Sequence, residues 1–271
     1  MTTNLKAYLS IFRIRFINAL QYRAAALAGV STQFAWGFME IIAFQAFYQA
    51  NPEAFPMQFS QTVSYVWLQQ AFLTLFMMWY WESDIAAEIT EGAIAYQMVR
   101  PIDLYSRWFT QAAANRLARA TLRCAPILLV TFFLPAPFRM SLPPNLAALL
   151  AFVVSLVLAL GVVVAFSMLV YVTLFHTLAP AGIRLMVSGF SDFLAGGLIP
   201  LPFFPASIRA LIELTPFAAM LNMPSRIYNG HIAGIDALAG IGLQAFWLVT
   251  LVAIGRLLLA RSVKKVVVQG G

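Results

Sequence analysis

Two acidic residues lie where a charge is costly, because the stretches around them are otherwise apolar. Glu40 interrupts the first long hydrophobic run of the chain, and Asp192 interrupts a later one. If these runs cross a membrane, each charge costs about 2.5–3.5 kcal/mol and must face protein or a wet cavity. Both residues are therefore candidates for a substrate path or a gating contact. The alternative is a structural polar contact with a neighbouring helix, which we favour for Asp192.

Three further acidic residues are spaced for a helix surface, since Asp84, Glu88 and Glu91 recur at i, i+4 and i+7. Apolar residues of the same stretch lie close to one helical face: Ile85, Ile89, Tyr96 and Val99. Like charges at this spacing destabilise an isolated helix by a few tenths of a kcal/mol per pair, and they gain nothing from lipid. A basic groove on a partner protein explains both observations, and a solvated acidic face is an equally good alternative.

The residues that follow predict how this helix ends and the next begins. Gly92 is expected to loosen the first helix, Arg100 with its following proline to end it, and Asp103 to cap the next one. Three arginines of that next helix fall at i, i+3 and i+7, a spacing that suits lipid headgroups: Arg116, Arg119 and Arg123.

No catalytic or metal site is predicted. His176 and His231 have no neighbouring ligands in sequence, and the motifs HExxH, GxxxxGK[ST] and GxSxG are absent. The single cysteine, Cys124, excludes an intrachain disulfide and a cysteine-based zinc site. We therefore expect a chain that is not an enzyme and that binds no cofactor of its own.

The composition indicates a membrane protein. The chain has 271 residues, of which 62% are hydrophobic and 10% charged, and a mean hydropathy of +0.82. Soluble domains carry about 25% charged residues, so an ordinary soluble protein is excluded. The net charge of +7 comes from basic residues at the ends of apolar runs, which is typical of membrane-flanking loops rather than of a nucleic-acid surface.

The hydropathy pattern predicts an all-α membrane protein with a single transmembrane domain over residues 1–271. Six membrane-crossing helices are expected, at about 24–48, 62–81, 122–138, 146–175, 181–200 and 235–258. Residues 4–22 predict an amphipathic interfacial helix, the alternative being an extension of the first span. Residues 82–123 form the one long polar interval, and residues 200–233 predict a re-entrant hairpin of short helices.

The basic residues also predict the orientation. Fourteen of the seventeen Lys and Arg residues fall on the side that carries both termini and residues 82–123, which places both termini in the cytoplasm and residues 200–233 outside. On the outer side, Phe203 and Phe204 lie between prolines and predict either an apolar plug or ordinary packing. Arg209 and Glu213, at i and i+4, are expected to pair.

In this order the parts resemble those of a type-2 ABC exporter permease. EITEGAIAYQMVRPIDLY at 88–105 resembles the coupling region of that family, and GGLIPLPFFP at 196–205 is similar to the outer end of its fifth span. The opening FRIRFINALQYRAAALAGV resembles the branch whose ATPase is a separate polypeptide. The resemblance covers essentially the whole chain.

The resemblance implies a complex in a bacterial plasma membrane. Such permeases work in pairs, with an identical or homologous partner, and bind two cytoplasmic ATPase subunits that hold ATP and magnesium. Membrane lipids but no nucleic acid would be further partners. The segment 84–99 would couple to the ATPase through residues of the polar interval: Asp84, Glu88, Glu91, Gly92 and Arg100. The substrate would pass between spans one, two and five, with Phe203 and Phe204 at an outer gate. No position identifies the cargo.

Two other functions fit a polytopic chain. A stand-alone secondary transporter or channel would use Glu40 and Asp192, but it would also predict internal repeats, and none is visible in the sequence. A membrane scaffold without transport activity would not need a re-entrant segment.

Overall fold

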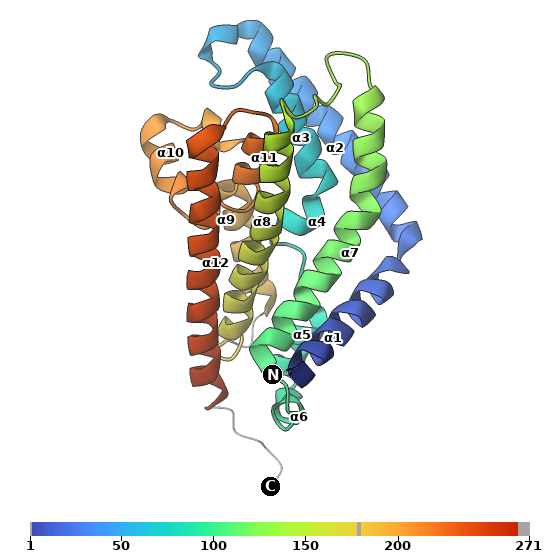
Figure 1. Ribbon diagram of the computed structural model, residues 1–271, viewed down its shortest axis with the longest axis vertical. Coiled ribbons are helices and arrows are strands. Elements are labelled where there is room, and N and C mark those ends of the chain that lie inside the picture. Colours follow the sequence, from blue (N-terminus) through green and yellow to red (C-terminus); the bar gives the residue numbers. More distant parts are fainter. Residues whose placement is uncertain (1, 178–179, 265–271) are drawn as a thin grey trace.

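The computed structural model describes residues 2–177 and 180–264, and every regular element within these ranges is a helix (Figure 1). The expected all-α fold is therefore confirmed. In chain order the elements are α1 (Thr2–Leu20), α2 (Arg23–Ala50), η1 (Pro52–Ala54), α3 (Phe59–Ala71), α4 (Leu73–Phe76), α5 (Ser83–Thr90), α6 (Ile94–Met98), α7 (Leu104–Phe133), α8 (Leu146–Thr173), α9 (Pro180–Leu194), η2 (Leu201–Phe203), α10 (Ala206–Glu213), α11 (Asn222–Tyr228) and α12 (Gly234–Val263).

Three helices of the described ranges are long and apolar enough to cross a membrane, namely α2, α8 and α12. They correspond to the spans predicted at 24–48, 146–175 and 235–258. Helix α8 has 28 residues and is therefore about 42 Å long, more than the roughly 30 Å of a bilayer's hydrocarbon core. It packs along α12 through most of the molecule (Figure 1).

The span predicted at 62–81 is not one continuous helix. Helix α3 ends at Ala71, α4 adds a single turn, and residues 77–82 have no regular structure. The carbonyl oxygens freed by this break are bound by Arg116 of α7, which donates to Met77 and Tyr80 at 2.8 Å each. A buried guanidinium thus replaces the intrahelical hydrogen bonds that a longer α4 would have formed.

The helix predicted from residue 122 begins much earlier, because α7 starts at Leu104. Asp103 caps it as expected, with its Oδ2 accepting from the backbone N–H of Ser106 at 2.9 Å. The alanine-rich sequence from 112 to 120 favours continuous helix. The predicted polar interval 82–123 is therefore not separate from span three, since nearly all of its second half, residues 104–123, belongs to the same helix.

Helix α9 is shorter than the span predicted at 181–200. It has 15 residues, about 22 Å, and ends before Gly196, whose φ of +84° favours glycine. A Cβ at Gly196 would also lie 2.6 Å from the hydroxyl oxygen of Tyr65. The following stretch 200–233 forms the short helices expected there: η2, α10 and α11.

The start of α1 and the end of α12 lie at the same end of the molecule as α5 and α6 (Figure 1). Helix α1 lies against α7, so the predicted apolar stripe is divided. Phe12 and Phe16 are half-buried, whereas Leu5 and Leu9 are exposed. A helix is therefore present in the predicted segment, and it covers part of α7 as well as presenting apolar side chains outward. Its position in a membrane interface stays a prediction.

Candidate functional site

The first half of the polar interval forms two short helices, α5 and α6, at one end of the molecule (Figure 1). Gly92 separates them with a φ of +76°, and no atom lies within 4 Å of the position that its Cβ would occupy. The glycine is therefore required by backbone conformation and not by crowding. It ends α5 completely, where the sequence predicted only a loosened helix.

The predicted acidic stripe is divided between three environments. Glu88 accepts hydrogen bonds from Trp108 Nε1 at 2.9 Å and from both terminal nitrogens of Arg107, one of them at 3.1 Å. Asp84 accepts from Arg15 of α1 at 2.8 Å. Glu91 is exposed. Glu88 and Asp84 thus hold α5 against α7 and α1, and only Glu91 keeps a solvent-facing carboxylate without a bond to the described residues.

The predicted apolar face is divided as well, because the chain turns at Gly92. Ile85 is fully buried, but Tyr96 is 77% exposed and Val99 is 84% exposed. Ile94 faces inward and packs in the same cluster as Ile85. We call Tyr96, Val99 and the equally exposed Arg100 the α6 tip: a small apolar and basic projection held in place from its inner side.

Sequence reasoning did not identify Arg116 as a buried residue. Its side chain is 2% exposed, and it donates to the carbonyl oxygens of Thr74, Met77 and Tyr80 and to Ser167 Oγ. The prediction that it faces lipid headgroups is therefore wrong. The alanines around it were the available signal, since small residues let α7 approach its neighbours closely enough to bury a guanidinium.

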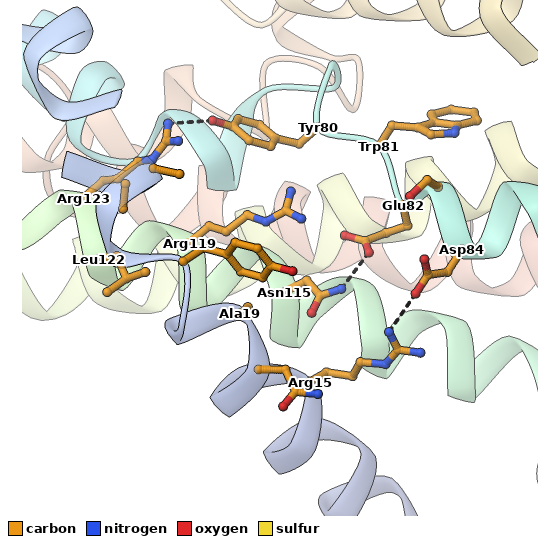
Figure 2. A pocket seen from close by; sticks show the side chains of 15 residues that line it. Arg15, Ala19, Tyr80, Trp81, Glu82, Asp84, Asn115, Arg119, Leu122 and Arg123 are labelled. Atoms are coloured by element: carbon orange, nitrogen blue, oxygen red, sulfur yellow. Dashed lines mark hydrogen bonds and ion pairs between the residues drawn. The ribbon is translucent and has the colours of Figure 1, made fainter. Parts of the chain in front are cut away.

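A cavity of about 520 Å³ lies between α1, α2, α7 and the segment that precedes α5 (Figure 2). It holds the other two arginines of the predicted triplet, Arg119 and Arg123, which lie 5.8 and 5.9 Å from the ring centre of Tyr80. Glu82 lines the same cavity and accepts from Asn115 Nδ2 at 2.6 Å. Burial raises the pKa of Glu82, and this effect outweighs the hydrogen bond and the nearby arginines, which lower it.

The two acidic residues in apolar runs have separate contacts. Glu40 Oε2 accepts from Gln70 Nε2 of α3 at 3.3 Å. Asp192 Oδ1 accepts from the backbone N–H of Met78 at 3.2 Å, within the break that follows α4. Asp192 therefore holds irregular backbone, which agrees with the structural contact favoured for it. Glu40 thus faces α3, and its role as part of a substrate path stays a prediction.

The predicted gate residues diverge. The ring of Phe203 stacks on Phe44 of α2 at 5.4 Å, whereas Phe204 contacts Phe193 of α9 at 5.3 Å. They join α2 and α9 to the segment that contains η2, and their two rings do not stack on each other.

The predicted pairing of Arg209 with Glu213 is wrong. Glu213 pairs with Arg226 of α11 at 2.5 Å, and Arg209 donates to the carbonyl oxygen of Pro202 at 3.1 Å. Glu213 therefore connects α10 to α11, and Arg209 connects it to η2, instead of the two side chains linking two turns of α10.

Comparison with known proteins gives one match over most of the chain. A family described as "ABC-2 family transporter protein" matches residues 34–270. The search of curated proteins returned no match. The matched region includes the α6 tip, the Arg116 contacts and the short helices η2, α10 and α11.

Proposed function

The chain belongs to the ABC-2 transporter family, the type-2 ABC permeases, and from that premise we propose that it is the permease subunit of an ATP-driven exporter. The observation that carries the proposal beyond family membership is the α6 tip. It exposes apolar side chains at the end of the molecule that carries the polar interval. A projection of that kind fits a groove on a second protein better than it fits water.

We infer that the partner is an ATPase, because association with an ATPase is general in this permease family. We expect two ATPase subunits per complex, with ATP and magnesium bound to them. We also expect a second permease, identical or homologous. The α6 tip contacts the ATPase together with Glu91 and Gly92, while Asp84 and Glu88 position α5 beneath it through Arg15 and Arg107.

The same contacts offer a route for movement from the ATPase into the membrane. Displacement of α5 acts on α7 through the bonds of Glu88 to Arg107 and Trp108. One rigid helix then connects these residues to Arg116, which binds the break after α4. Asp192 joins α9 to that break. The contacts are continuous, and only a measured change in coupling would establish that they transmit motion.

Orientation follows from the position of the ATPase contact. If the α6 tip meets a cytoplasmic ATPase, the start of α1 and the end of α12 are cytoplasmic too, since they share that end (Figure 1). This agrees with the distribution of basic residues. We propose a bacterial plasma-membrane protein with six crossings, in which α3–α4 and α9 are two interrupted ones.

The substrate path would lie between two permeases, along α2, α3 and α9. Glu40 on α2 would face it, and Phe203 and Phe204 would border its outer end through their contacts with α2 and α9. The alternative of an ion-coupled transporter that works alone needs both Glu40 and Asp192 in a path. Because Asp192 already binds a backbone amide, we prefer the ATP-driven exporter.

The test is purification of the tagged chain from its native membrane in mild detergent, with mass spectrometry of the proteins that accompany it. We expect a stoichiometric P-loop ATPase. The double variant Tyr96→Asp with Val99→Asp should lose the ATPase while its yield and elution volume stay unchanged, because both side chains are exposed and do not support the fold.

Leu142→Asp is the matched control, since Leu142 is 74% exposed in the loop between α7 and α8 at the opposite end. It should retain the ATPase. Recovery of the permease alone after crosslinking would contradict the proposed function. Retention of the ATPase by the double variant would contradict only the role of the α6 tip.

A further inference from the structure

The cavity in Figure 2 is lined by residues from the end of α1 and from the start of the membrane-crossing helix α2. It is bordered by the bend at residues 20–23, where α1 ends and α2, a membrane-crossing helix, begins. An amphipathic helix in the interface has its apolar face at the boundary between headgroups and acyl chains. Its junction with a crossing helix therefore lies at about the depth of the lipid phosphates.

One end of the cavity is cationic and lacks an anion. Both guanidinium groups of Arg119 and Arg123 approach the ring of Tyr80, and Arg123 also donates to the Tyr80 hydroxyl at 2.8 Å. Neither arginine forms an ion pair with the part of the chain that the structure describes, and Arg119 has no hydrogen bond there either. Two neighbouring guanidinium groups in this state favour an anion with several acceptor oxygens.

The other end is acidic and lacks a cation. Glu82 is 7% exposed, yet among the described residues its carboxylate has only Asn115 as a hydrogen-bond partner, and no arginine or lysine of these residues lies within ion-pairing distance. Figure 2 shows Glu82 and Asp84 on one side of the view, Arg123 and Tyr80 on the other, and Arg119 between them. Asp84 is already paired with Arg15, so Glu82 is the carboxylate that remains without a cation.

We propose that this cavity binds the headgroup of a phospholipid that carries both a phosphate and a primary ammonium, as phosphatidylethanolamine does. The phosphate lies between Arg119 and Arg123, and the ammonium binds Glu82. Ala25 and Leu122 form part of an apolar wall that leads to α2 and α7, along which the acyl chains lie. The volume is in the range of small-molecule sites. The proposal does not require the ATPase contact, although Arg15 and Asp84, which position α5, also line the cavity.

The separation of charge decides between lipid classes. A headgroup with a phosphate alone, such as phosphatidylglycerol, would satisfy the two arginines but leave Glu82 buried without a cation. A buried carboxylate in that state is costly. A headgroup with both charges gives the arginines an anion and Glu82 a cation, so the cavity favours the ammonium-bearing lipid.

The experiment is native mass spectrometry of the purified, delipidated full chain with equimolar phosphatidylethanolamine and phosphatidylglycerol. We expect the first lipid to be retained about tenfold more than the second, a ratio that corresponds to about 1.4 kcal/mol. Arg119→Gln with Arg123→Gln should lower retention at least about tenfold. Arg261→Gln, an exposed arginine of α12 outside the cavity, is the matched control and should bind as the unaltered chain does.

Glu82→Gln tests the ammonium end by itself. It should keep binding phospholipid but lose the preference for phosphatidylethanolamine. If the double arginine variant does not fold, Arg119→Gln replaces it, because Arg119 has no hydrogen bond within the described chain to lose. Equal retention by the arginine variants and the unaltered chain, or equal binding of the two lipids to the unaltered chain, would overturn the proposal.

A final arm separates a lipid from a soluble ligand of the same charge. Glycerophosphoethanolamine has the same charged groups without acyl chains, and it should displace the lipid only at a concentration about a hundredfold higher or more, because each buried methylene contributes about 0.8 kcal/mol. Displacement at equal concentration would assign the cavity to a soluble phosphate compound and overturn the lipid assignment.

Discussion

Replacing Arg116 with methionine should destabilise this protein more than replacing any neighbouring arginine. The guanidinium donates at 2.8–3.2 Å to the carbonyl oxygens of Thr74, Met77 and Tyr80, and at 3.4 Å to Ser167 Oγ. Methionine fills a similar volume but donates nothing. Three backbone carbonyl oxygens around the break after α4 would therefore lose their donor inside the protein.

The expected size follows from two opposing effects. A buried polar group left without its partner costs about 1–3 kcal/mol, so three carbonyls cost roughly 3–9 kcal/mol before any relaxation. The variant also no longer buries a charge, which returns several kcal/mol. We expect a net loss of about 3 kcal/mol. For a protein of this size each kcal/mol lowers the midpoint by about 2–4 °C, so the shift should be roughly 6–12 °C.

The assay is the thermal midpoint of the detergent-purified chain, followed by loss of the monodisperse peak in size-exclusion chromatography at one heating rate, because such unfolding is often irreversible. Arg119→Met is the matched control: it lies one turn further along the same helix and has no hydrogen bond to the described residues. It should shift the midpoint by less than about 3 °C. Equal shifts for Arg116→Met and Arg119→Met would refute the role assigned to Arg116.

Two further predictions concern carboxylates near this region. Glu88→Gln should lower the free energy of unfolding by about 1–3 kcal/mol, because Arg107 and Trp108 would lose a charged acceptor, whereas Glu91→Gln, at an exposed site, should leave the thermal midpoint unchanged; equal midpoints for the two variants would contradict the internal role of Glu88. The pKa of Glu82 is raised above its ordinary 4.5, so the protonated form favours the fold. Stability relative to Glu82→Gln should therefore fall as the pH rises above about 4.5, and a difference between the two that does not vary with pH would contradict the burial of this carboxylate.

The sequence predicted correctly those helices that are marked by their own residues alone. Helices α2, α8 and α12 are long apolar runs, and hydropathy alone locates them. The early start of α7 falls in a polar stretch that gives no hydropathy signal, and the break after α4 is held by Arg116, which meets Met77 and Tyr80 across 39 and 36 positions of the chain. Hydropathy carries no information on such a pair. It therefore extended one helix to residue 81 and began another at residue 122.

The sequence predicted which acidic residues belong to the candidate site, but it did not predict which basic residues pair with them. Spacing placed Asp84, Glu88 and Glu91 on one face, as it must for an uninterrupted helix. What decides their exposure is the charge opposite each one, and that charge comes from α1 for Asp84 and from α7 for Glu88. The glycine at position 92 is the local signal visible in the sequence. Its positive φ turns the chain, so that the exposed apolar side chains belong to the α6 tip and not to α5.

Glu40 supplies an argument for a second permease that is independent of the ATPase. It lies in the middle of α2, beside Trp36 and Met39, which are 55% and 58% exposed. One hydrogen bond of 3.3 Å from Gln70 is little support for a carboxylate at that depth, where a charge facing hydrocarbon costs at least about 2.5–3.5 kcal/mol. A partner that covers this face of α2 would replace lipid with protein or with an enclosed aqueous path. We therefore propose that a second permease covers the exposed side chains of Trp36 and Met39 and the edge of the Glu40 site, in place of lipid.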